Sequence, residues 1–363
     1  MKIRLADSSD DVQLRKLMRT CGVPGHIRMA YSREPDYFRA VGLLGGDAQV
    51  AVADKSGEIV GVGCREVNEL YVDGEKASVG YLSGLRLRDD VRNGTLLARG
   101  YAFLGKLHND HRTKFYLTTI VSGNSRAIET LTAKRANLPS YVFIGDYIVH
   151  IVPVKRKSAR IPSEGEFDIQ TGERVPPDEI LNFLNREGRR RQFFPVNDRE
   201  KVGVFRHIDK KDMYIAMKDG EMVGFLAVWN QEDMKQHTVS GYSTVMKIGL
   251  PLINTGLKIG GFYALPGVGE RFRSAAISLV CFRDDNAAAF RATLRYAMNR
   301  IAGSGVHQVG VGMFAADPLR RGMRGIFHMA YRSKVFLVCW EDGVSFCNST
   351  KRKKVPYLEL AVL

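Results

Sequence analysis

Hydrophobic and polar residues alternate along three consecutive segments in the first half of the chain. Short polar turns at residues 55–57 and 73–74 separate these segments, and such turns join antiparallel strands in hairpins. The alternation therefore predicts three antiparallel strands, at residues 49–54, 58–67 and 77–88.

Apolar residues at helical spacing predict helices on either side of these strands. The first helix contains Leu14, Leu17 and Met18, and it follows a short strand predicted at residues 2–6. Further helices are predicted at 36–44, 95–108 and 124–135, a further strand at 115–121, and two closing strands within 141–152. A helix between two strands is the usual parallel crossover, so the strands at 77–88 and 115–121 are expected to be parallel.

The second half repeats this order of elements after a polar, charged segment at residues 155–165, which is the best candidate for a linker. Strands are predicted at 167–170, 213–218, 222–230, 275–283 and 308–314, and helices at 177–185 and 286–301. The repeat predicts two domains in tandem, 1–157 and 166–363, without detectable sequence identity. Residues 231–274 form an insertion, whose apolar run at 248–257 is expected either to cover an acceptor groove or to pack between the halves.

The composition is that of a soluble globular protein. Of 363 residues, 45% are hydrophobic and 26% are charged, which excludes a disordered chain. The five scattered cysteines contain no C-x-x-C pair, which excludes a disulfide scaffold and fits a reducing compartment. No apolar run approaches the ~18 residues that span a bilayer, and the first residues do not form a secretory leader. A cytoplasmic location is therefore expected.

The formal net charge is +15, and the excess of basic residues is spread over both halves. Such a charge attracts polyanions. Nucleic acid, an anionic membrane surface and a phosphate-rich cofactor such as coenzyme A all satisfy this condition, so charge alone does not choose among them.

A first stretch of the first half carries a family resemblance. Residues 85–97, LRLRDDVRNGTLL, resemble the coenzyme A loop of the GNAT superfamily of N-acyltransferases, roughly L-x-V-x-P-x-x-R-x-x-G-x-G. The matching residues are Leu85, Leu87 and Arg92. Thr95 and Leu97 stand where the family has glycines. In that family, backbone N–H groups of the loop and of the following helix receive the pyrophosphate of acyl-CoA.

The missing glycines matter because glycine lets a backbone approach a phosphate closely. We expect Asn93 and Gly94 to form the turn instead, and the Thr95 hydroxyl to replace one amide donor. A degenerate loop that binds no cofactor is the alternative.

A second stretch, residues 117–131 (LTTIVSGNSRAIETL), resembles the family's strand followed by N-x-x-A-x-x-L-Y. The matching residues are Asn124, Ala127, Ile128 and Leu131. In the family the Asn and the Ala lie beside the pantetheine arm, in a notch where two parallel strands splay apart. The family's tyrosine, which commonly protonates the leaving thiolate, corresponds here to Thr132.

The resemblance implies both a fold and a reaction. The fold is α/β (α+β), with two GNAT-like domains in tandem, each a mixed, mostly antiparallel sheet with helices on both faces, as in myristoyl transferases and Fem-type aminoacyl transferases. The reaction is direct transfer from acetyl-CoA (or other acyl-CoA) to a small-molecule or peptide amine in a ternary complex. The residues implied to bind coenzyme A are Leu85, Arg86, Leu87, Arg92, Asn93, Gly94, Thr95, Asn124 and Ala127.

Acyl transfer to an amine requires a donor that polarises the thioester carbonyl, a base for the ammonium and an acid for the thiolate. Backbone N–H groups at residues 85–87 can supply the first. The catalytic candidates are Glu66, with Glu69 beside it, as base, Tyr81 as relay for a water, and Tyr116 or Tyr141 as acid. For each of them, an ordinary surface carboxylate or core tyrosine is the competing interpretation.

The last residues, 354–363, read as an apolar strand that is expected to complete the second sheet. In some tandem members of the superfamily the terminal carboxylate is itself the base. This makes Leu363 a further candidate.

Other motifs lead to alternative functions. The basic residues 189–191 beside Phe193 and Phe194, and the run 351–354, could contact nucleic acid, which is possible but not favoured because charge runs are usually solvated faces. An aminoacyl-tRNA-dependent transferase of the same fold and a non-catalytic scaffold are the two alternatives. His108 and His111 lack a third ligand, so no metal site is expected, and neither is a membrane partner. The oligomeric state is left open.

Overall fold

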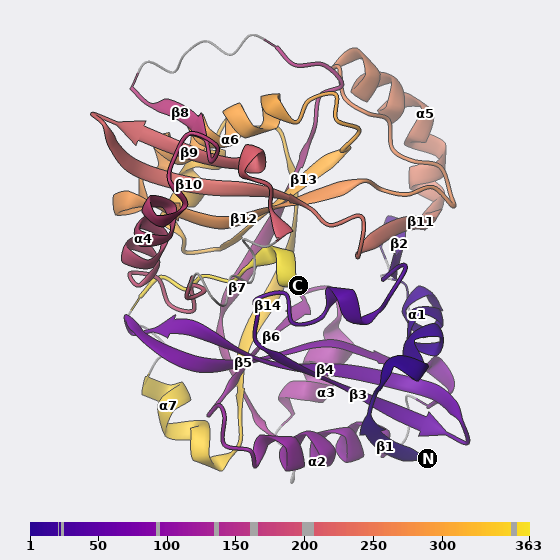
Figure 1. Cartoon of the computed structure of the whole chain (residues 1–363). Coiled ribbons are helices and arrows are strands. Elements are labelled where there is room, and N and C mark those ends of the chain that lie inside the picture. Colours follow the sequence, from indigo (N-terminus) through magenta and orange to yellow (C-terminus); the bar gives the residue numbers. More distant parts are fainter. Residues whose placement is uncertain are drawn as a thin grey trace.

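The computed structural model describes residues 1–20, 22, 25–91, 95–133, 138–159, 166–197, 207–349 and 354–363. Its main element is a twelve-stranded sheet that runs through the molecule (Figure 1). In spatial order its strands are β1 (Lys2–Leu5), β3 (Asp47–Lys55), β4 (Glu58–Val72), β5 (Glu75–Leu87), β6 (Tyr116–Val121), β14 (Met329–Cys339), β7 (Ser140–Pro153), β13 (Gln308–Phe314), β12 (Ser274–Phe282), β10 (Glu221–Asn230), β9 (Met213–Lys218) and β8 (Asp168–Thr171). A separate ribbon pairs β2 (Ile27–Ser32) with β11 (Gln236–Tyr242).

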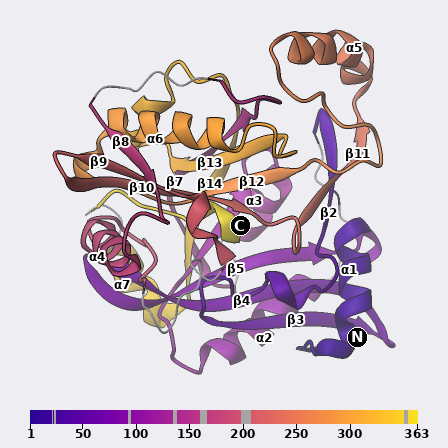
Figure 2. The same cartoon turned by 45° about the horizontal axis from the view of Figure 1, so that its top comes forward.

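Helices cover both faces of this sheet, as the mixed α/β pattern predicts. They are α1 (Asp11–Thr20), α2 (Leu96–His108), α3 (Ser125–Thr132), α4 (Pro177–Gly188), α5 (Thr244–Ile259), α6 (Ala287–Arg300) and α7 (Val344–Ser349). Alternate side chains of β3 and β4 point to opposite faces, so Val52 packs with α1 whereas Ala53 packs with α2. Figure 2 shows these two helices on opposite sides of the first-half strands, and α4 and α6 on opposite sides of the second-half strands.

The order predicted for the first half is largely confirmed. β3, β4 and β5 are consecutive antiparallel strands. β5 and β6 are parallel neighbours, joined by the predicted helix α2. In each of these elements the hydrophobic residues recur with the period of a strand or of a helix, which is why the sequence predicts them.

The closing strand of the first half differs from the expectation. Residues 140–153 form one long strand, β7, instead of two, because the chain bends at Gly145 (φ 157°) without reversing. β7 leaves β6 and pairs with β13 of the second half, while β14 of the second half inserts between β6 and β7. Each half thus gives a strand to the centre of a shared sheet, and the division into units 1–157 and 166–363 remains a proposal.

The helix predicted at residues 36–44 is wrong. Only a 3-10 turn, Phe38–Ala40, forms there. The Asp36 carboxylate accepts a hydrogen bond from the Phe38 N–H, which fixes a turn, and Gly42 and Gly45 have positive φ values that end any helix.

The insertion forms strand β11, which belongs to the ribbon, and helix α5. The sequence patterns did not predict these two elements individually. The apolar run 248–257 lies on α5, where Ile248 and Leu252 are each 79% exposed. It therefore does not pack between the halves. No helix among the described residues is long and apolar enough to cross a membrane.

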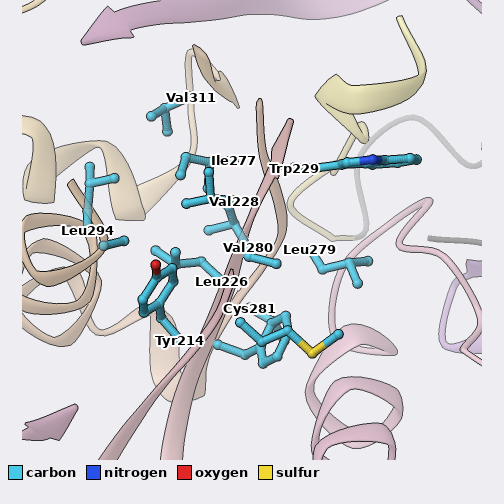
Figure 3. Close-up of a cluster of buried hydrophobic side chains, with 14 of the residues drawn as sticks. Tyr214, Leu226, Val228, Trp229, Ile277, Leu279, Val280, Cys281, Leu294 and Val311 are labelled. Carbon is cyan, nitrogen blue, oxygen red and sulfur yellow. The ribbon is translucent and has the colours of Figure 1, made fainter. Parts of the chain in front are cut away.

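The largest core lies in the second half, between the sheet and helices α4 and α6. Figure 3 shows its centre, where Tyr214 and Leu226 of the β9–β10 hairpin lie on the side of Leu294 of α6, whereas Trp229 lies on the opposite side of the strands. The left-handed residue Leu279 (φ 52°) marks a bulge in β12 at this point.

The predicted C-terminal strand is also wrong. Residues 354–363 make a single β-bridge at Pro356 and end in a 3-10 turn, Leu360–Val362. The buried Glu359 carboxylate replaces strand pairing. It accepts hydrogen bonds from the Leu279 N–H (2.9 Å), the Tyr357 hydroxyl (2.6 Å) and the Ala361 N–H (3.0 Å). The segment thereby provides a hydrogen-bond acceptor for the backbone N–H of Leu279 at the bulge of β12. It also fills the space between the two halves of the chain.

We expect Glu359→Ala to lower the free energy of unfolding by about 3 kcal/mol, because it leaves three buried donors unpaired in a site where Glu359 is 2% exposed. Urea unfolding followed by circular dichroism measures the difference. Glu341→Ala, at an exposed position, is the control and should change stability by less than about 0.5 kcal/mol. If Glu359→Ala lowers the free energy of unfolding by less than about 1 kcal/mol, the C-terminal segment does not stabilise the contact between the two halves.

Candidate active site

The two parallel strands of the first half separate to form a notch. β5 and β6 pair at Gly80↔Tyr116 and Tyr81↔Leu117 and form no further pair, although both strands continue. β5 turns away because it carries a bulge against β4, with Gly84 at φ 65°. The Thr118 hydroxyl bridges the start of the opening by donating to the Leu82 carbonyl oxygen (2.9 Å).

A cavity of about 470 Å³ occupies this notch. Many of the residues predicted to bind coenzyme A or to take part in catalysis line it, although they come from separate elements. They are Tyr81, Leu85, Arg86 and Leu87 on β5, and Asn124 and Ala127 at the start of α3. Arg92, Asn93 and Gly94 lie outside the described residues. The structure thus brings both family-like stretches to one place.

Helix α2 begins at the cavity. Thr95 is its N-cap residue, and the Thr95 side chain makes no capping hydrogen bond. Leu96, Leu97 and Gly100, from the first turns, line the cavity wall. The positive end of the helix dipole is therefore available to an anion at this position.

Helix α3 supplies the facing wall. Its N-cap is Asn124, whose side-chain oxygen accepts from the Ala127 N–H (3.2 Å). Asn124, Ala127 and Leu131 share one helical face and line the cavity. Thr132, at the position of the family tyrosine, donates to the Ile128 carbonyl oxygen (2.8 Å), so its hydroxyl is used within the helix.

A third wall is the β2–β11 ribbon, which sequence analysis missed. Tyr31 and His237 are register partners, their rings lie 5.3 Å apart, and both line the cavity together with Arg33. Gln236 fixes the ribbon, because its side chain accepts from the Ser32 hydroxyl and the Glu34 N–H and donates to the Glu34 carbonyl. The alternation of Ile27, Met29 and Tyr31 was the available signal for this strand.

No protein-family model and no curated protein matches this sequence. Solved structures match it in fold. A GCN5-related N-acetyltransferase from Sphaerobacter thermophilus superposes with a TM-score of 0.55 at 13% identity, over 98% of this chain and 97% of that one. N-myristoyltransferase from Saccharomyces cerevisiae, solved with bound myristoyl-CoA, superposes with a TM-score of 0.59 at 10% identity, over 93% of this chain and 78% of that one.

The chain has the GNAT fold. The notch between β5 and β6 lies where the family resemblance implied it, and the stretches at 85–97 and 117–131 flank it.

Of the catalytic candidates, Tyr81, Tyr141 and Leu363 line the cavity in the GNAT notch. Tyr81 lies on β5. Its hydroxyl is 3.5 Å from the Thr119 hydroxyl, and burial raises its pKa well above the usual range of a phenol. Glu66 does not line the cavity. Its carboxylate is buried beside the Cys64 thiol, and burial raises its pKa. Glu69 is exposed and also lies away from the lining.

Tyr116, the candidate acid, does not reach the notch either. Its hydroxyl accepts from Arg65 Nε (3.0 Å) and lies 2.9 Å from His108 Nδ1. Arg65 also pairs with Asp110, and His108 stacks on Trp340 with ring centroids 4.7 Å apart. Tyr116 and His108 thus belong to a packed polar network and do not line the cavity themselves, although Arg65 of the same network does. The alternation of β6 does not reveal this, because it does not say which face the notch uses.

Two tyrosines close the far side of the GNAT notch. The hydroxyl groups of Tyr101 and Tyr141 form a hydrogen bond, and burial raises the pKa of Tyr101 to about 12. Tyr101 continues an apolar wall along α2 with Leu104 and Leu107. At the opposite side, Val362 and Leu363 reach the lining from the C-terminal segment.

The basic cluster at residues 189–191 is largely used inside the protein. Arg191 pairs with Asp285 and with Asp317 (2.7 Å to the latter), and Arg190 pairs with Glu187 and Asp284. The neighbouring Phe193 and Phe194 are buried. These contacts stabilise the junction between α4 and the second sheet. In the run 351–354, only Lys354 is among the described residues.

Burial lowers the pKa of His237 to about 4, compared with 6.5 for an ordinary histidine. Between pH 6.5 and about 4 the unfolded chain binds a proton at this residue and the folded chain does not. Stability is therefore expected to fall as the pH falls through this window, by about 1 to 2 kcal/mol at pH 5 from His237 alone.

His237→Gln should remove that part of the pH dependence, which urea unfolding at pH 7 and pH 5 measures. In the wild type, the His237 ring resonances should stay constant in NMR spectra from pH 8 to pH 5.5. Titration of this ring near pH 6.5 would contradict the expectation.

Proposed function

We propose that the chain is an N-acyltransferase that uses acyl-CoA, with acetyl-CoA as the donor, and transfers the acyl group directly to a small-molecule or peptide amine in a ternary complex. The observation that carries the proposal is the cavity in the β5–β6 notch, which both family-like stretches and the start of α2 line. The GNAT fold supports it, because this notch is where the family resemblance implies acyl-CoA binding.

The residues present fit such a donor. The N-terminus of α2, with no capping bond from the Thr95 side chain, suits a pyrophosphate. Arg86 lines the same cavity from the α1 face of the sheet, because its register partner Val62 packs with α1. The apolar wall of Leu97, Leu104 and Leu131 suits the pantetheine arm. Bound acyl-CoA would supply an acyl group activated as a thioester.

We assign the polarising role to the backbone. Past the bulge at Gly84, β5 has no strand partner on its β6 side, so N–H groups between Leu85 and Leu87 can donate into the notch. Donors fixed by a strand need no reorganisation as negative charge develops on the thioester oxygen.

We assign proton handling to water held by Tyr81. Because burial raises the pKa of this phenol, Tyr81 stays protonated at neutral pH and orients a water molecule. As the C–N bond forms and the C–S bond of the thioester breaks, this water passes the proton of the amine to the leaving thiolate, which departs as the coenzyme A thiol. Glu66 is not needed for this step, since it lies outside the cavity lining.

The donor site is tested with Gly100→Asp. A side chain at Gly100 meets nothing within 4 Å in the structure, and Gly100 lines the cavity one turn from the start of α2. The added carboxylate repels the pyrophosphate, so we expect at least about a 10-fold weaker affinity for coenzyme A. Isothermal titration calorimetry measures it.

Gly100→Asn is the matched control, of equal size without the charge, and should bind nearly as the wild type does. If acetyl-CoA, longer acyl-CoA and free coenzyme A at millimolar concentration all fail to raise the melting temperature of the wild type, the site does not bind the donor. At 100 times the dissociation constant the donor should add about 2.7 kcal/mol to stability. The scaffold and RNA-dependent alternatives would then take precedence.

The relay is tested with Tyr81→Phe. We expect kcat to fall by about 100-fold, because the water loses its hydrogen-bond partner, while the affinity for coenzyme A changes little. Steady-state kinetics with an acceptor found by screening amines measures both. Tyr296→Phe, on α6 in the second half, should leave kcat unchanged. An unchanged kcat in Tyr81→Phe would remove Tyr81 from the mechanism.

A further inference from the structure

A buried arginine that forms no ion pair among the described residues faces the cavity from the ribbon side. Arg33 is 7% exposed and lines the cavity. Its Nε and Nη1 atoms have no hydrogen-bond partner, and it forms no ion pair with a carboxylate of the described residues. Desolvating a guanidinium without an anion is unfavourable by several kcal/mol, so such a group is unusual unless a ligand supplies the anion.

The surroundings of Arg33 hold it in place without forming an ion pair with it. Its guanidinium lies 4.5 Å from the ring centroid of Tyr37 and 5.9 Å from that of Tyr31. These rings fix its orientation by cation–π contacts. The other buried cation nearby, Lys235, donates to the Ala361 carbonyl oxygen (2.7 Å) and does not line the cavity. Burial alone would raise the pKa of Tyr31, but the positive charges of Lys235 and Arg33 lower it. Arg86 lowers the pKa of Tyr31 as well, and the buried Glu66 carboxylate interacts with Lys235 and Arg33 without forming an ion pair with either. These three cations and one carboxylate leave the region electropositive.

Arg33 is separate from the proposed pyrophosphate site. Tyr37, on which it packs, belongs to the apolar cluster on the α1 face of β3 and β4. Leu96, at the start of α2, belongs to the cluster on the opposite face. The cavity passes through the notch from one face of the sheet to the other, so a donor at α2 leaves the Arg33 side free for the acceptor.

We propose that Arg33 binds a carboxylate of the acceptor, which makes the acceptor an amine that also carries a free carboxyl group, such as an amino acid or a short peptide. This proposal rests on the proposed function. A planar monoanion matches the planar guanidinium, and aromatic walls suit one carboxylate better than a strongly hydrated phosphate dianion. Tyr31 and His237, beside Arg33, would contact the rest of the acceptor.

The test uses the full-length protein with coenzyme A bound, which is established first by the shift in melting temperature. A missing shift would concern the proposed function and not Arg33. Ligand-observed NMR then measures binding of dipeptides with a free carboxyl end and of the same dipeptides amidated, which keep the same amine. A second comparison, of phosphoethanolamine with ethanolamine, measures any preference for a phosphate group.

In the wild type we expect the free acids to bind at least 10-fold more tightly than the amides. Arg33→Gln should abolish this preference, and Arg39→Gln, an exposed arginine paired with Asp233, should keep it. Equal binding within every acid–amide pair, including no binding of either, would overturn the proposal, as would a preference that survives in Arg33→Gln. A phosphate preference larger than the carboxylate preference would overturn the assignment to a carboxylate.

Arg33→Met separates ligand binding from a structural role. Because it removes an uncompensated buried charge, its melting temperature without ligand should equal or exceed that of the wild type. A melting temperature several degrees lower would mean that Arg33 serves the fold, and it would count against the proposal. The comparison of acids with amides in the wild type needs no variant and decides the question even if both variants fold poorly.

Discussion

The pairing of β14 with β6 is the constraint on which the site depends. Each residue of β6 has a register partner on β14, from Val121↔Ser333 to Tyr116↔Val338. β6 is therefore held along one edge over its whole length, while its other edge meets β5 at two positions only. When β5 bends away at Gly84, β6 cannot follow it. The opening that becomes the cavity is thus created partly by a strand from the far end of the sequence.

The elements that sequence patterns located are those whose hydrogen bonds are local or whose burial is regular. β3, β4, β5 and α2 belong to this group, and so do the hairpin of β9 and β10 and the helix α6. The elements that the sequence patterns missed form their hydrogen bonds with residues far away in the sequence. β2 and β11 are short strands that pair with each other across the two halves, and β11 makes one further bridge, Thr238↔Arg271. The C-terminal segment has the alternation of a strand, yet Glu359 and Pro356 commit its backbone to other contacts.

The residues of the candidate site divide in the same way, into those that local structure positions and those that depend on the wider fold. The resemblance pointed to Leu85, Asn124 and Ala127, which line the cavity, because their positions depend on backbone shape next to one strand or helix. It could not place Tyr116, since strand alternation leaves open which face a notch will use. Looking for runs of basic residues in the sequence was misleading for a similar reason. The cluster at 189–191 attracts attention as a basic run, yet Arg191 is neutralised in the core, whereas the isolated Arg33 forms no ion pair within the described part of the chain.

The exchange of β7 and β14 also has a consequence for biosynthesis. When the first half leaves the ribosome, β6 and β7 present unpaired edges, and β14 is made only after residue 329. Exposed strand edges of this kind recruit other chains, so the nascent protein is vulnerable to aggregation until the second half is complete. The strand that holds β6 in place is made late, so the site reaches its final form among the last parts of the molecule. A shared central sheet thus ties the order of folding to the order of synthesis.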